Sequence, residues 1–327
     1  MTAQTGEGRL GRSSGKRVVC IGECMIELSH VDVGQLRMAF GGDTSNTAVY
    51  LARLTRRFGF KVDYVTALGD DAYSESMLAF WRGEGVGTGL VTRLPGRLPG
   101  IYTIRTDAGG ERSFTYWRGQ AAARDLLKDG RDINLASALS GVDLAYLSGI
   151  TLSILDKEQR IALLGILAGL RHAGGKVAFD GNFRPAGWLD LNEARFWFDQ
   201  CLGCTDIALP TLDDEQALFG GDTTASAVAA RLHERGVAEV GVKLGARGCY
   251  LSTEGGGELI DTMPAEPVID STAAGDSFNA GYLGGRLVDL PPKDAARLGH
   301  RLAGEVVRHR GAIIPSDAMP KEVMAWP

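Results

Sequence analysis

Short apolar runs alternate with stretches of helical spacing along most of the chain. Continuous apolar runs bounded by turn residues predict buried strands at 17–23, 62–68, 142–147, 176–179, 206–209 and 239–243. Apolar positions at helical spacing predict helices at 44–58, 74–81, 157–171, 225–235 and 293–310. This alternation predicts an α/β fold, a doubly wound and mostly parallel sheet with helices on both faces.

One region departs from this pattern. Residues 100–117 form two alternating strand-like runs around Ala108, Gly109 and Gly110, which is a hairpin signal. Because these runs are aromatic and polar rather than uniformly apolar, we expect a small β-flap, or lid, that stands off the main sheet. A second hairpin is predicted at 250–260, around three consecutive glycines.

Composition narrows the function classes. Hydrophobic residues make up 44% of the chain and charged residues 23%, which excludes disordered and fibrous proteins. The net charge of −5 argues against nucleic acid or an anionic membrane as a partner. No run reaches 18 apolar residues, and five sparse cysteines are typical of reduced thiols, so we expect a cytoplasmic location. Residues 1–16 are polar and predict a flexible lead-in without a signal peptide; a main domain at 17–315 and a tail at 316–327 follow.

The strongest candidate site lies in residues 270–278, DSTAAGDSF. Ala273, Ala274 and Gly275 lead into a predicted helix that begins near Asp276. A helix start presents unpaired N–H groups and a partial positive charge, and small side chains let an anion approach them closely. Asp276 either caps this helix or serves as a general base beside the anion, and the segment alone favours the cap, because Asp is common at helix starts.

Polar residues at a second predicted helix start form another candidate. Gly41 and Gly42 predict a tight turn, and Asp43 and Asn46 follow at the start of the helix. These side chains are either ordinary caps or a binding site for the hydroxyls of a polyol.

Two further candidates follow predicted strands. Asn182 and Arg184 come just after the strand at 176–179, where open α/β sheets bind ligands, and the Arg184 fork suits a phosphate or carboxylate. Lys243, Gly245 and Gly248 form a strand end and a turn, a weak signal of a nucleotide site.

Together these elements resemble the PfkB-type (ribokinase-like) carbohydrate kinases from about residue 17 to 315. The first family signature corresponds to 41–54 and the second to 270–276, where Ser271 replaces a Thr and Ala273 a Gly. The resemblance implies that Asp276 is the catalytic base, which reverses the preference for a cap. It also implies an anion hole at Ala273, Ala274 and Gly275, and ATP contacts at Asn182, Lys243, Gly245, Gly248, Ala273 and Gly275.

The family usually carries an N-x-x-E motif that positions a metal through water. Here Thr211 stands at the Asn position and Asp214 at the Glu position. The resemblance therefore implies ATP and Mg²⁺, with the metal contact at Asp214 or Glu215, and it leaves open a monovalent cation.

Within the family, phrases such as GECMIELS, FGGDTSNTAVYLAR and RLPGIY are similar to the kinases that act on 2-keto-3-deoxy-D-gluconate. The resemblance implies ATP-dependent phosphorylation of its 6-hydroxyl in sugar-acid catabolism. It places Gly41, Gly42, Asp43, Asn46, Tyr102, Tyr116, Arg118, Arg184 and Asp276 at the substrate. The alternatives are a kinase of a neutral sugar such as fructose, or a non-catalytic binding regulator. Flap aromatics also suit packing against a partner subunit, so we expect a homo-oligomer that forms through the lid strands.

Overall fold

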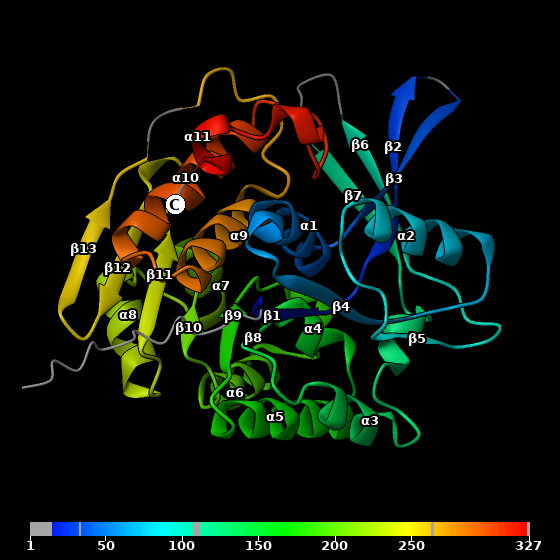
Figure 1. Ribbon diagram of the computed structural model, residues 1–327, viewed down its shortest axis with the longest axis horizontal. Helices are drawn as coiled ribbons and strands as arrows, with labels where there is room; N and C mark the ends of the chain where they lie inside the picture. Colours follow the sequence, from blue (N-terminus) through cyan, green and yellow to red (C-terminus); the bar gives the residue numbers. More distant parts are fainter. Residues whose placement is uncertain (1–14, 33, 107–111, 263–264, 326–327) are drawn as a thin grey trace, which may run out of the picture.

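The computed structural model describes residues 15–32, 34–106, 112–262 and 265–325. Most of the predicted lead-in at 1–16 and the turn at 108–110 therefore lie outside the described residues. The predicted fold class is confirmed: a large sheet is flanked by helices on both faces (Figure 1).

Nine strands of the described chain form the main sheet, in the order β13-β12-β11-β10-β9-β8-β1-β4-β5. From β11 to β5 all neighbouring pairs are parallel, whereas β12 and β13 are antiparallel. Their bounds are β1 (Arg17–Ile21), β4 (Lys61–Leu68), β5 (Val91–Arg93), β8 (Leu144–Ser148), β9 (Lys176–Asp180), β10 (Ile207–Ala208), β11 (Glu239–Lys243), β12 (Cys249–Thr253) and β13 (Gly256–Ile260). The carboxyl ends of the parallel strands meet at one edge of the sheet.

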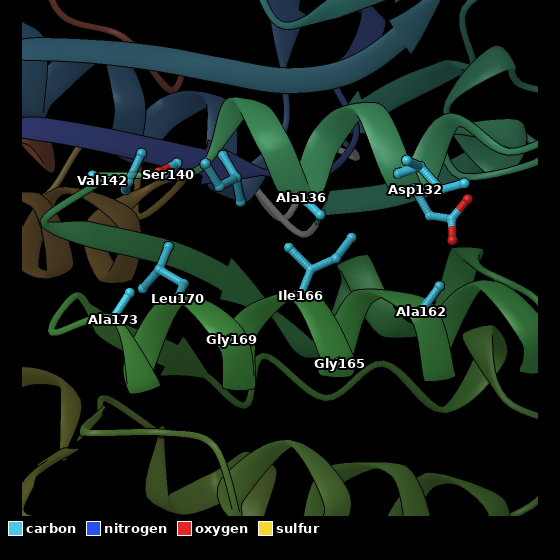
Figure 2. Close-up of a pocket in the computed structure, with 13 residues that line it drawn as sticks. Asp132, Ala136, Ser140, Val142, Ala162, Gly165, Ile166, Gly169, Leu170 and Ala173 are labelled. Carbon is cyan, nitrogen blue, oxygen red and sulfur yellow. The ribbon is translucent and has the colours of Figure 1, made fainter.

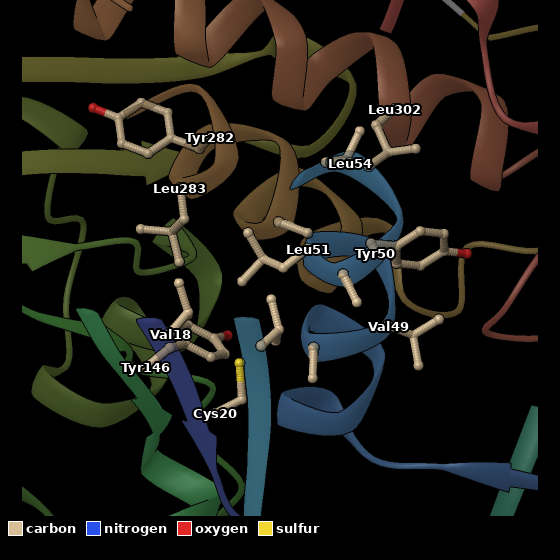
Figure 3. Close-up of a cluster of buried hydrophobic side chains, with 14 of the residues drawn as sticks. Val18, Cys20, Val49, Tyr50, Leu51, Leu54, Tyr146, Tyr282, Leu283 and Leu302 are labelled. Carbon is tan, nitrogen blue, oxygen red and sulfur yellow. The ribbon is translucent and has the colours of Figure 1, made fainter. Parts of the chain in front are cut away.

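Two apolar clusters cover the two faces of this sheet. One contains side chains of α1, α2, α9, α10 and α11, and the other contains side chains of α3 to α8. Strand β4 alternates between them, with Tyr64 on the first face and Val65 on the second. Figure 3 shows the first cluster, where Cys20 of β1 lies below Leu51 of α1 and Leu283 of α9. The helices are α1 (Asp43–Thr55), α2 (Ala72–Gly83), α3 (Arg131–Ala138), α4 (Gly149–Ile154), α5 (Lys157–His172), α6 (Leu191–Leu202), α7 (Leu212–Phe219), α8 (Ala225–Glu234), α9 (Ala274–Leu287), α10 (Pro292–Val306) and α11 (Lys321–Met324).

A second sheet stands off the first, at the upper right of Figure 1. Its order is β3-β2-β6-β7, with β2 (Met25–Asp32), β3 (Gln35–Gly41), β6 (Ile101–Thr106) and β7 (Arg112–Trp117). The predicted hairpin at 100–117 is confirmed as β6 and β7. The sequence did not predict β2 and β3, because burial falls steadily along them from base to tip instead of alternating.

All five cysteines are free and buried. Within the part of the chain that the structure describes, no helix is both long and apolar enough to cross a membrane.

Candidate active site

Charged and polar side chains collect at the edge where the parallel strands end. Asp180 closes β9 and Lys243 closes β11. Helices α1 and α9 pack side by side and both begin at this edge (Figure 1). Open α/β sheets bind their ligands in this position, and the sequence-predicted residues Asp43, Asn46 and Asp276 meet here.

Asp276 occupies the centre of this group. Its Oδ2 accepts a hydrogen bond from Asn46 Nδ2 at 2.8 Å, and its backbone carbonyl accepts one from Thr47 Oγ1 at 3.2 Å. Burial, with a smaller effect of the nearby Asp43 and Asp180 carboxylates, raises the pKa of Asp276 to about 7, although Asn46 and Lys243 oppose the shift. The N-cap of α9 is Ala273, so the interpretation of Asp276 as the helix cap is wrong. A carboxylate with this pKa is suited to accept a proton near neutral pH.

The loop before α9 is shaped to present backbone N–H groups. Ala273 has φ +60, and Asp270 holds the loop through its two carboxylate oxygens, which accept from the backbone N–H groups of Thr272 and Gly311 at 2.8 Å each. The N–H of Ala274 donates to Ser271 O at 3.2 Å. The first turn of α9 therefore offers an anion chiefly the N–H groups of Gly275 and Asp276.

A buried polar network supports this loop. Lys243 Nζ lies 2.5 Å from Asp180 Oδ2 and 3.3 Å from Asn279 Oδ1. Asn279 Nδ2 in turn donates to Asp180 Oδ2 at 2.6 Å. A Cβ built on Gly275 would lie 3.5 Å from Lys243 Nζ, so the ammonium group flanks the helix start and adds positive charge there. Sequence reasoning missed Asp180 and Asn279: the strand end at Asp180 was a usable signal, whereas a mid-helix Asn gave none.

Asn182 joins the two sides of the site. Its φ is +36, and its Nδ2 donates to Asp43 Oδ2 at 2.7 Å. The structure thus places Asn182, expected at ATP, against Asp43 of the expected sugar site.

Gly245 and Gly248 lie in the turn between β11 and β12. Both have positive φ, and a Cβ on Gly248 would come within 2.1 Å of Ile260 O on β13. Backbone conformation and close packing therefore explain both glycines without a ligand.

The predicted metal-contacting carboxylates differ in their surroundings. Glu215 is buried and paired with Arg231, and burial raises its pKa to about 7. Asp214 is more exposed; its Oδ1 accepts from Arg184 Nη1 at 3.1 Å, and burial raises its pKa. Arg184 therefore reaches the site edge with its guanidinium on Asp214.

The donor set fits Mg²⁺ that arrives with a nucleotide. Mg²⁺ in such sites takes one or two carboxylates and completes its shell with phosphate oxygens and water. In the described chain, no group of three or more His, Cys, Asp or Glu side chains is arranged to hold a metal without such help. Asp214 is the better oxygen donor of the two candidates, because its carboxylate is more exposed, although both are paired with an arginine.

The remaining candidate site residues belong to the lid. Tyr102 donates a hydrogen bond from its hydroxyl to Glu27 Oε2, and Ser29 Oγ donates to Glu27 Oε1 at 3.0 Å. A Cβ on Gly41 would lie 2.3 Å from the Tyr102 hydroxyl, so only glycine leaves room for it. The half-exposed Tyr116 stacks on Tyr102 with 5.8 Å between ring centroids.

The base of the lid contains an ion pair. Arg118 Nη2 donates to Glu23 Oε2, and the Glu23 backbone carbonyl lies 2.2 Å from where a Cβ of Gly42 would be, so Gly42 permits this close approach. Glu23 and Glu27 were both missed as site residues, although both belong to the stretch GECMIELS.

Two cavities of the described chain lie elsewhere. One of about 550 Å³ is lined by residues of α3 and α5 (Figure 2), and another of about 420 Å³ lies beside β5. Their linings are mainly apolar and contain none of the candidate site residues.

Comparison with known proteins gives matches over nearly the whole chain. Residues 16–319 match the family described as pfkB family carbohydrate kinase. The chain is 48% identical over 309 residues to the 2-dehydro-3-deoxygluconokinase of Escherichia coli (strain K12), covering 93% of this chain and 99% of that protein. It is also 48% identical over 308 residues to the 2-dehydro-3-deoxygluconokinase of Dickeya dadantii (strain 3937), with the same coverage. Among solved structures, fructokinase with bound ATP from Xylella fastidiosa has a TM-score of 0.79 at 23% identity, covering 94% of this chain and 97% of that one.

Proposed function

Because this chain belongs to the pfkB family of carbohydrate kinases, we propose that it transfers the γ-phosphoryl group of ATP to the 6-hydroxyl of 2-keto-3-deoxy-D-gluconate. This compound is the same as the 2-dehydro-3-deoxygluconate in the names of the chain's relatives. The observation that carries the reaction is the position of Asp276, a carboxylate of raised pKa in the first turn of α9 beside an anion-binding loop. The observation that carries the substrate is 48% identity over 93% of the chain to two 2-dehydro-3-deoxygluconokinases.

In this proposal Asp276 accepts the proton of the 6-hydroxyl as its oxygen attacks the γ-phosphorus, and ADP leaves. The N–H groups of Gly275 and Asp276, with Lys243, stabilise the negative charge that develops on the phosphoryl oxygens. Asn46 holds the Asp276 carboxylate in place by its 2.8 Å hydrogen bond. Mg²⁺ would neutralise phosphate charge, with Asp214 as its protein contact through water. A monovalent cation is an open part of the proposal, tested by comparing turnover in K⁺ and in tetramethylammonium buffers.

Arg118 is the proposed partner of the substrate carboxylate. A sugar acid carries a charge that needs compensation when water is excluded, and the planar guanidinium fits a carboxylate. Tyr102 and Tyr116 line the same side of the lid, and Arg184 is proposed to lie near the sugar and the transferred phosphate. Reduced thiols and a supply of ATP favour the cytoplasm as the location of the reaction.

We also propose that the lid mediates self-association. Large apolar side chains on its strands are exposed in the single chain, namely Leu36, Met38, Phe114 and Trp117. Two copies packed lid against lid would remove them from water. Light scattering of the purified chain tests this: a dimer that Trp117→Lys dissociates supports it, and a monomeric wild type contradicts it.

The decisive test of function is product analysis. The purified chain is incubated with ATP, Mg²⁺ and 2-keto-3-deoxygluconate, and the sugar product is examined by mass spectrometry and phosphorus NMR. We expect stoichiometric ADP and a phosphate ester at C6. An ester at another carbon, or ADP without a phosphorylated sugar, contradicts the proposal.

A further inference from the structure

Glu23 lies where the main sheet joins the lid. It follows β1 and precedes β2, and its side chain is only 1% exposed. Its Oε2 accepts a hydrogen bond from Arg118 Nη2. Its Oε1 is buried and has no hydrogen-bond partner in the described chain, and it lies 3.0 Å from where a Cβ of Gly100 would be. One oxygen of the Glu23 carboxylate is thus bonded to Arg118, and the other has no hydrogen-bond partner among the described residues.

Arg118 follows β7 at the other connection between lid and main domain, and its side chain is 23% exposed. Among the described residues, its guanidinium group makes one hydrogen bond, which Nη2 donates to Glu23 Oε2. A guanidinium group has five N–H donors in a fixed plane. A carboxylate that holds one end of that plane leaves the other donors in a fixed orientation for a second acceptor.

The charges around Glu23 agree with such an anchor. Burial raises the pKa of Glu23, and the Arg118 and Arg124 guanidinium groups lower it, whereas the Asp43 carboxylate raises it. A long arginine side chain at a lid edge has many rotamers, and ordering it costs free energy. A buried carboxylate that holds one guanidinium nitrogen orders the arginine side chain before substrate binds, so substrate binding does not have to supply that free energy.

We propose that Glu23 is the positioning residue that holds the Arg118 guanidinium at the sugar site, so that selection of a sugar acid over a neutral sugar depends on Glu23 as well as on Arg118. The inference deepens the proposed function and rests on it. Glu23 does not touch the substrate carboxylate; it acts through Arg118.

A double-mutant cycle tests this inference. Glu23→Gln keeps the shape and one hydrogen bond but removes the charge, and charge-assisted hydrogen bonds are about twice as strong as neutral ones. We expect KM for 2-keto-3-deoxygluconate to rise about 5- to 10-fold, with kcat and KM for ATP within about 2-fold of wild type. In an Arg118→Ala background the same change should alter KM less than about 2-fold. An equal factor in both backgrounds, an unchanged KM, or a lower KM overturns the inference.

A matched control separates this effect from loss of an ion pair in general. Glu84 is bonded to Arg53, with Oε2 2.7 Å from Arg53 Nε, and neither residue is a candidate site residue. Glu84→Gln should leave the KM of both substrates unchanged, whatever it does to stability.

A chemical measurement makes the test independent of the substrate. Phenylglyoxal modifies accessible guanidinium groups, and peptide mass spectrometry locates the modified arginines. Arg118 should react several-fold faster in Glu23→Gln than in wild type, while the exposed Arg184 reacts at the same rate in both. An unchanged rate at Arg118 overturns the inference. A wild type that phosphorylates only neutral sugars refutes the proposed function instead, and the modification rates then still report whether Glu23 holds Arg118.

Discussion

Asn46 and Asp276 are 230 positions apart in the sequence, and their side chains meet at 2.8 Å. This hydrogen bond joins the first turns of α1 and α9, so the glycine turn on the sugar side and the anion loop on the phosphate side form one site. Asn46 also opposes the rise in the pKa of Asp276 that burial causes. A single contact therefore both positions the proposed base and tunes its protonation.

Asp276→Asn should abolish most turnover while ATP still binds. Asn has nearly the same shape but cannot accept the proton, and loss of a general base costs on the order of 10²–10⁴ in rate. Steady-state kinetics with ATP and 2-keto-3-deoxygluconate measure kcat, and calorimetry measures ATP affinity. A near-normal kcat would show that Asp276 is not the base.

The same variant should be more stable than wild type. In the folded chain the pKa of Asp276 is about 7, against an ordinary value of 3.8, so the ionised form is disfavoured there. The resulting destabilisation is absent below about pH 4, grows through the interval, and is complete above about pH 7. Asn carries no charge, so its Tm should exceed that of wild type by more at pH 8 than at pH 5. A Tm below wild type at pH 8 would contradict the assigned direction.

The pH dependence of kcat/KM should report Asp276 directly. Only the ionised form accepts a proton, so activity should rise with pH and level off above a midpoint near pH 7. Asn46→Ala removes a hydrogen bond to the ionised form and should move the midpoint upward by roughly 0.7 pH unit, for a bond of about 1 kcal/mol. Thr47→Val is the control, because the Thr47 hydroxyl bonds the backbone carbonyl of Asp276 and not its carboxylate. A midpoint that Asn46→Ala leaves unmoved rules out this tuning.

The sequence predicted the main sheet well for a physical reason. Parallel strands such as β1 and β11 are buried on both faces, so they read as continuous apolar runs. The candidate anion site at 273–275 was visible because three consecutive small residues at a helix start are unusual; α9 begins among them, at Ala274. By contrast, β2 and β3 lack alternation because they protrude from the main domain and are buried only at their bases.

Tertiary pairing explains the site residues that the sequence did not predict. Lys243 meets Asp180 from 63 positions away and Asn279 from 36, and no local pattern encodes these distances. Arg118 was expected at the substrate, and the structure adds a partner that the sequence did not predict: Glu23, 95 positions away. Each of these contacts requires the complete fold before it can be recognised.

Gly275→Ala should raise the stability of the fold slightly and lower the activity. A methyl group would meet only Lys243 Nζ, at 3.5 Å, and Ala is favoured over Gly in a helix by up to about 1 kcal/mol. Tm should therefore rise slightly. The methyl group would stand where phosphate approaches the N–H groups, so kcat/KM for ATP should fall on the order of 10-fold or more. Gly304→Ala, in α10 with open space around it, is the control that should leave the kinetics unchanged. Wild-type kinetics in Gly275→Ala would place the phosphate elsewhere.

Arg118→Ala should weaken recognition of the substrate carboxylate. Charge-assisted hydrogen bonds contribute about 1.5–3 kcal/mol, so kcat/KM for 2-keto-3-deoxygluconate should fall about 10- to 150-fold. The loss should lie mostly in KM, because the carboxylate is remote from the reacting hydroxyl. KM for ATP should hardly change, and the slow turnover of fructose should fall less. Equal losses for both sugars would mean that Arg118 supports only the lid.

The most direct test of the whole account is the ratio of kcat/KM for 2-keto-3-deoxygluconate to kcat/KM for fructose, measured as ADP release by one wild-type preparation with ATP and Mg²⁺. A pocket that carries Arg118 and Arg184 should favour the sugar acid by at least about 10-fold, since a neutral sugar cannot make the charge-assisted contact. A ratio at or below one would contradict the substrate assignment and leave a neutral-sugar kinase. Absence of turnover with either sugar, although both bind, would contradict the kinase activity itself.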